Sequence, residues 1–134
     1  MNTDYNIENS KERTPMESLI LLLVILGLSD RQLIFVEREK MDSIISKYFP
    51  DHSAARYQKL LQSSISAIQE LDNLSCSEYL NILSNELKLF YTEKDRLHIL
   101  FEDLKGLLEA DGIIYSSESE MLNIIRTSWG HKEG

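Results

Sequence analysis

A run of ten consecutive apolar residues, Leu19–Leu28, constrains this chain more than any other feature. A membrane-spanning helix needs about 20 such residues, and Ser29 and Asp30 end the run well before that length. The preceding residues 1–18 are more acidic than basic and no small-residue cleavage pattern follows, so a secretion signal is not expected. The run therefore predicts a helix buried on most of its sides in a soluble, cytoplasmic protein.

The composition further restricts the fold classes and the kinds of binding partner that we expect. The 134 residues have room for one domain, and five Gly and two Pro are too few for a loop-rich β-sandwich. A net charge of −8 disfavours nucleic acid and anionic lipid as partners, and it favours cations and basic protein surfaces. A single cysteine excludes a disulfide framework and a cysteine-rich zinc site.

Apolar residues recur at intervals of three and four along the rest of the chain, as in amphipathic helices. No segment shows sustained period-two alternation, so strands are not expected. We predict an all-α bundle of about six helices, or seven if a middle one is split, and the helices cover about 15–29, 36–48, 54–71, 76–91, 93–109 and 117–129. A single domain at 14–130 would lie between a disordered tail at 1–13 and a short tail at 131–134.

Residues suited to helix ends stand at most of these boundaries. The predicted caps are the capping boxes Thr14–Glu17 and Ser75–Glu78, Asp51 or Ser53, Thr92, and Gly130 at the end of the last helix. The fifth helix has the most regular apolar stripe, from Leu97 to Leu108. The inward residues of the fourth and sixth helices are predicted to include Tyr79, Leu83, Leu87, Phe90, Leu122, Ile125 and Trp129.

An internal repeat is the most informative feature for function. The segments Leu26–Ile45 and Leu107–Ile125 each contain the end of an apolar helix, a small residue followed by aspartate, and a second apolar helix. In both copies a glutamate follows the aspartate by seven residues, as in the pairs Asp30–Glu37 and Asp111–Glu118. Two units of helix, acidic turn and helix therefore flank the middle of the chain.

The second acidic turn matches half of an EF-hand calcium loop. With Glu118 at loop position 12, Gly112 takes position 6 and Asp111 takes position 5. Position 1 would be Leu107, which cannot bind a metal. Since calcium takes six to eight oxygen ligands, one turn alone is too poor in ligands, and a metal site requires the two turns to meet.

The segment LLEADGIIYSSESEMLNII at Leu107–Ile125 resembles the signature of the TerB-like family: an apolar helix, Ala-Asp-Gly, polar residues, Glu and another apolar helix. The similarity covers about residues 15–130, although Arg31 stands where the family pattern has glycine. The resemblance implies an all-helical, non-enzymatic protein that acts with protein partners in tellurite or metal stress. It also implies that a divalent metal is bound by Asp30, Glu37, Asp111 and Glu118.

Two other interpretations use the same residues. The carboxylates can act as helix caps and first-turn charges, which would make the chain a metal-free protein-interaction adaptor. A helical metalloenzyme of the di-iron type would carry Glu-x-x-His pairs, and the chain has none. Zinc-helix spacing is also lacking among His52, His98 and His131. No catalytic residue is predicted, and the metal, the partner and the oligomeric state stay open.

Overall fold

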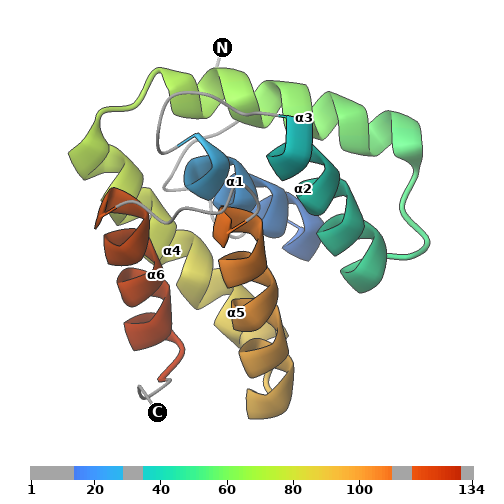
Figure 1. Ribbon diagram of the computed structural model, residues 1–134. Coiled ribbons are helices and arrows are strands. Elements are labelled where there is room, and N and C mark those ends of the chain that lie inside the picture. The colour runs from blue at the N-terminus through green and yellow to red at the C-terminus, as the bar shows by residue number, and fades with distance from the viewer. Residues whose placement is uncertain (1–13, 29–34, 110–115, 131–134) are drawn as a thin grey trace.

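The computed structural model describes residues 14–28, 35–109 and 116–130, without the side chains of 35–37, 73–74, 94 and 116–118 (Figure 1). The predicted tails lie outside the described residues. The all-α prediction is confirmed, because the described ranges contain six helices and no strand. The helices are α1 (Pro15–Gly27), α2 (Phe35–Tyr48), α3 (Ala54–Gln69), α4 (Asn73–Phe90), α5 (Lys94–Leu108) and α6 (Ser116–Ser128).

Helix α1 forms the centre of the fold, as its apolar sequence predicts. The Thr14 side chain accepts a hydrogen bond from the Glu17 backbone N–H at 3.2 Å, and Glu17 accepts one from the Thr14 N–H at 2.8 Å. This confirms the predicted capping box. Every residue from Met16 to Gly27 except Glu17 is buried, because α2, α3, α4 and α5 all pack against α1.

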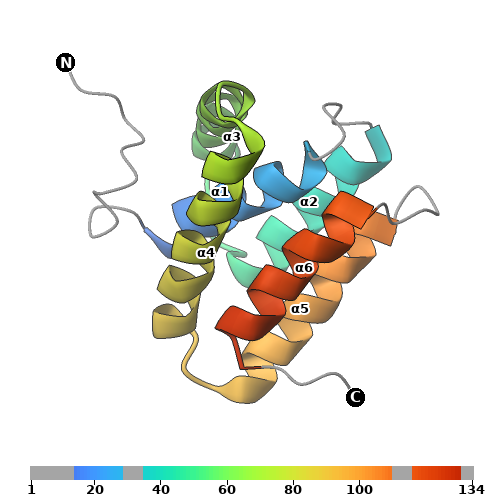
Figure 2. The ribbon, with the colours of Figure 1, turned by 90° about the vertical axis from the view of Figure 1, so that its left-hand side faces the viewer.

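Helices α2, α3, α4 and α5 surround α1, and α6 packs against α4 and α5 (Figures 1 and 2). Helix α3 crosses the bundle above α1, while α4, α5 and α6 lie side by side in Figure 2. The predicted stripe of α5 is confirmed, since all six of its members are buried: Leu97, Leu100, Phe101, Leu104, Leu107 and Leu108. Their burial fixes α5 between α2 and α6.

The C-terminal end of α6 is held on α4 by Trp129. This side chain is 3% exposed, and its Nε1–H donates to the Ser84 carbonyl oxygen at 2.8 Å. The next residue, Gly130, has φ +72°, the left-handed conformation that glycine adopts after a helix end. The predictions for both residues are confirmed.

One predicted helix start and one predicted cap are wrong. Helix α4 begins at Asn73, three residues before the predicted Cys76. The Asp72 carboxylate accepts the Ser75 backbone N–H at 2.7 Å, which holds the pKa of Asp72 below its usual value. Asp72 thus caps an extra turn ahead of the predicted box. Helix α5 follows Glu93, whose side chain makes no capping bond, so Thr92 is not the cap.

Candidate functional site

Two of the predicted metal ligands, Asp30 and Asp111, belong to the connections that follow α1 and α5, and the other two, Glu37 and Glu118, belong to the first turns of α2 and α6. Asp30 and Asp111 lie outside the described residues, as do the side chains of Glu37 and Glu118. The structure describes the helices that each connection joins. The ends of these helices show where each acidic connection begins and ends on the bundle.

The two helix–turn–helix units have the same register. In each unit the first helix ends three residues before the aspartate, and the glutamate is the third residue of the second helix. The helix ends joined by the turns are Gly27 and Phe35 in the first unit, and Leu108 and Ser116 in the second. The connecting segments, 28–34 and 109–115, therefore have equal length.

The joined helix ends lie on the same side of the bundle. Figures 1 and 2 both place the C-terminal ends of α1 and α5 and the N-terminal ends of α2 and α6 together on one side of the bundle. Helix α5 packs against both helices of the first unit. The helix ends that the two acidic connections join therefore lie on one side of the bundle, as a site shared by both connections requires.

The described histidines do not form a second candidate metal site. Within the described ranges, no group of three or more His, Cys, Asp or Glu side chains is arranged to hold a metal ion. His52 lies between α2 and α3, where its Nδ1 is 2.7 Å from the Phe49 carbonyl oxygen and its ring meets Tyr57 edge-on. His98 is exposed on α5, and His131 lies outside the described residues.

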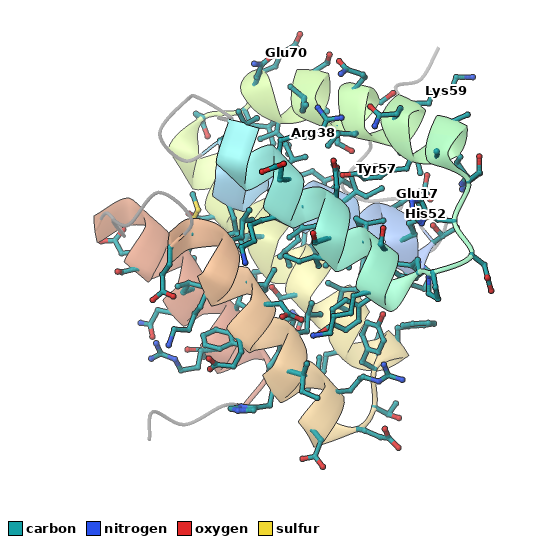
Figure 3. All side chains as sticks on the ribbon, turned by 45° about the vertical axis from the view of Figure 1, so that its right-hand side comes forward. Glu17, Arg38, His52, Tyr57, Lys59 and Glu70 are labelled. Carbon is teal, nitrogen blue, oxygen red and sulfur yellow. The ribbon has the colours of Figure 1, made fainter. Side chains whose placement is uncertain are left out.

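A polar network links α2 to α3, and Figure 3 shows two of its members, Arg38 and Tyr57, between these helices. Arg38 Nη2 donates to Gln58 Oε1 at 2.8 Å, and the Tyr57 hydroxyl donates to Asp42 Oδ1 at 2.5 Å. Burial of the Tyr57 hydroxyl is the main cause that raises its pKa, and the hydrogen bond to Asp42 is the second. Tyr57 therefore stays a protonated donor and acts as a structural tie.

A second polar link joins α2 to α5. Asp103 Oδ2 accepts from the Tyr48 hydroxyl at 2.7 Å and from Lys47 Nζ at 2.9 Å. Burial of the Tyr48 hydroxyl is the main cause that raises its pKa, and the hydrogen bond to Asp103 is the second. A tyrosine that keeps its proton cannot serve as a base near neutral pH, so the arrangement is structural. Repeat and capping signals do not reveal either link, because each joins residues far apart in sequence.

These two tyrosines predict a loss of stability at alkaline pH. An unfolded tyrosine has a pKa of about 10, and in the folded protein the pKa values of Tyr48 and Tyr57 are higher. Above pH ~10 the folded state therefore binds more protons than the unfolded state, and stability falls as pH rises. Urea unfolding midpoints at pH ~9 and ~11 measure this fall. A Y48F/Y57F double variant should show a smaller fall, and an equal fall would contradict the assignment.

An apolar groove lies where the last turn of α4, the first turn of α5 and the end of α6 meet. It has a volume of about 680 Å³ and is lined by residues that include Leu89, Leu97 and Trp129. Leu89 is 80% exposed. The prediction that Phe90 points inward is wrong, because Phe90 is 51% exposed while Tyr91 is buried in its place.

Comparisons of the chain with protein-family models, curated proteins and solved structures give no match. Of the helices in the described part of the chain, none has the length and apolarity needed to cross a bilayer. The TerB-like family therefore stays a proposal that rests on the repeated motif.

Proposed function

We propose that this chain is a non-enzymatic binding module of the TerB-like type, which binds a divalent cation between its two acidic turns. The ligands would be the carboxylates of Asp30, Glu37, Asp111 and Glu118. From the resemblance we further propose that the module works with a protein partner in the cytoplasm, in the response to tellurite or metal stress.

The shared register of the two units is the observation that carries this proposal. Each unit has its aspartate three residues after one helix and its glutamate at the third position of the next. If the repeat extends to the turns, both units present the same pair of carboxylates. The joined helix ends lie on one side of the bundle (Figures 1 and 2), which supports a single site.

The chemistry of the donor set determines which metals fit. Carboxylate oxygens are hard ligands, and Ca²⁺, Mg²⁺ and Mn²⁺ prefer oxygen over nitrogen or sulfur. Four carboxylates would also repel one another without a cation, and a chain of net charge −8 adds to that repulsion. Cation binding would relieve this repulsion, so the cation should stabilise the fold.

Calorimetric titration with calcium, magnesium, manganese and zinc tests the proposed cation site. We expect weak binding that is lost in Asp111→Asn and kept in Asp51→Asn, a control at an exposed carboxylate in the α2–α3 connection. No heat at millimolar metal, or unchanged binding in Asp111→Asn, would contradict the proposal.

The stability of the metal-free protein distinguishes whether Asp111 is a metal ligand or only a helix cap. As one of several crowded carboxylates, Asp111 contributes repulsion, so Asp111→Ala should leave metal-free stability level or raise it, and should remove stabilisation by metal. As a helix cap alone, its replacement by alanine should cost about 1 kcal/mol. Urea unfolding with and without metal distinguishes these results, and destabilisation with no effect of metal on either protein would favour the adaptor.

The second candidate function is that of a protein-interaction adaptor, and the apolar groove favours it. Leu89 lines this groove and is 80% exposed, and the adjacent Phe90 is 51% exposed; neighbouring exposed apolar side chains are typical of protein interaction sites. Binding a partner through this groove requires no metal, so the two functions can be tested separately and can coexist in one module.

A further inference from the structure

We infer that Tyr57 of α3 is a positioning residue for the proposed cation site. Tyr57 holds Asp42 on α2, and α2 carries Glu37, one of the four proposed ligands, in its first turn. The inference rests on the proposed function, because it names a residue that sets the cation affinity of that same site. It also gives a role to α3, which belongs to neither of the two helix–turn–helix units.

Two polar contacts join the first part of α2 to α3, between which Figure 3 shows Arg38 and Tyr57. The Tyr57 hydroxyl donates to Asp42 Oδ1 at 2.5 Å, and Arg38 Nη2 donates to Gln58 Oε1 at 2.8 Å. Arg38 Nε lies 3.5 Å from the same Asp42 oxygen. Residues four apart lie on one face of a helix, so Arg38 and Asp42 together hold one face of α2 against α3.

These contacts lie close to the proposed ligand along α2. Glu37 directly precedes Arg38 in the sequence. Asp42 lies one and a half turns after Glu37, at a distance of about 7.5 Å along the helix axis. Backbone hydrogen bonds connect successive turns and make a helix stiff over such a length. A rotation or shift of α2 at Asp42 is therefore carried to the backbone of Glu37.

The bond from Tyr57 adds a directional restraint to α2. Helix α2 packs against α1 and α5, and its described buried apolar side chains are those of Met41, Ile44 and Ile45. The hydrophobic effect that drives their burial is non-directional, whereas a hydrogen bond has a preferred distance and angle. The Tyr57–Asp42 bond therefore restrains the rotation of α2 about its own axis more specifically than apolar packing does.

Cation affinity depends on such a restraint. The ligands of a binding site need to be held within about 0.5 Å of their productive positions. Because side chains extend to about 5–6 Å from a helix axis, a rotation of about 10° moves a carboxylate by about 1 Å. A small rotation of α2 is thus enough to move the Glu37 carboxylate away from a cation held by the other ligands.

The second unit has a different bond at the corresponding position. Asn123 is the eighth residue of α6, as Asp42 is of α2, and its Oδ1 accepts from Arg126 Nη1 of the same helix at 2.9 Å. Helix α6 packs against α4 and α5. The Tyr57–Asp42 bond therefore belongs to the first unit, and its loss should displace Glu37 of that unit.

Calorimetric titration of Mn²⁺ into the full chain tests the inference with two matched variants. Tyr57→Phe removes the hydroxyl that bonds α2 near its beginning, and Tyr48→Phe removes the one that bonds Asp103 at the other end of α2. In each variant the carboxylate keeps a basic partner, Arg38 or Lys47. We expect Tyr57→Phe to weaken Mn²⁺ binding by about three- to tenfold, less than the loss of a group bonded directly to a metal ligand. Tyr48→Phe should change the affinity by less than about twofold, as expected for a distant site.

Two substitutions of Asp42 separate positioning from charge. Asp42→Asn and Asp42→Ala both remove one negative charge, so the loss of electrostatic attraction for the cation is the same in both. Asparagine keeps an acceptor oxygen for the Tyr57 hydroxyl, and alanine does not. We expect Mn²⁺ to bind Asp42→Ala at least about threefold more weakly than Asp42→Asn. Urea unfolding of each variant shows that binding is compared between folded proteins.

Two results would overturn the inference. Equal Mn²⁺ affinity in Tyr57→Phe and Tyr48→Phe would mean that the Tyr57–Asp42 bond supports the fold alone. Equal affinity in the two Asp42 variants would reduce the role of Asp42 to its charge. In both cases, binding of Mn²⁺ by the unmodified chain would leave the proposed cation site in place. No binding by the unmodified chain would instead contradict the proposed function itself, and the positioning role of Tyr57 with it.

Discussion

Leu22→Ala is expected to lower the free energy of unfolding by about 2–5 kcal/mol. Leu22 lies in the middle of α1 and is fully buried, with α2, α3, α4 and α5 packed around its helix. Truncation removes three side-chain carbon atoms from the apolar contacts and leaves a cavity. Since four helices meet at α1, the surrounding side chains cannot easily move to fill this cavity.

Urea unfolding followed by circular dichroism measures this effect. Leu89→Ala is the matched control, because it deletes the same atoms from a side chain that is 80% exposed, and it should change stability by less than about 0.5 kcal/mol. Similar costs for the two variants would contradict the central position of α1.

Trp129→Ala is expected to cost about 3–5 kcal/mol, the range for large aromatic side chains in a core. Trp129 is 3% exposed and meets the Phe101 ring edge-on, with 6.5 Å between ring centroids. Its N–H bond to the Ser84 carbonyl oxygen also joins the end of α6 to α4. Alanine removes the ring packing and this bond together.

Trp129→Phe separates the two contributions. It keeps most of the apolar ring and removes the bond to Ser84, so its cost should be clearly smaller than that of Trp129→Ala. Thermal and urea unfolding provide the comparison. A loss below about 1 kcal/mol in Trp129→Ala would mean that α6 is not held on α4 by this residue.

The sequence predicted the elements whose pattern is local. The apolar run of α1 and the stripe of α5 locate two helices, because burial on one face repeats every three to four residues. The start of α4 was predicted three residues late, since both Asp72 and Ser75 are good caps and only the folded backbone shows which one accepts the bond.

The two candidate sites, the acidic repeat and the apolar groove, also differ in whether their pattern is local in the sequence. The acidic repeat is visible in the sequence, because its spacing is carried by neighbouring residues. The groove is not, because it depends on where α6 ends along α4, which the Ser128–Asn85 contact reveals. The helical position of Phe90 predicts an inward side chain, yet Phe90 is 51% exposed and the adjacent Tyr91 is buried.

The central claim is that one cation is shared by the two acidic turns, and binding of paramagnetic Mn²⁺ followed by NMR tests it most directly. The ion broadens backbone amide signals close to its site. We predict that substoichiometric Mn²⁺ broadens the signals around Asp30–Glu37 and around Asp111–Glu118 together, and that Asp111→Asn removes both effects. Broadening around one turn alone, or none around either turn, would contradict a shared cation site.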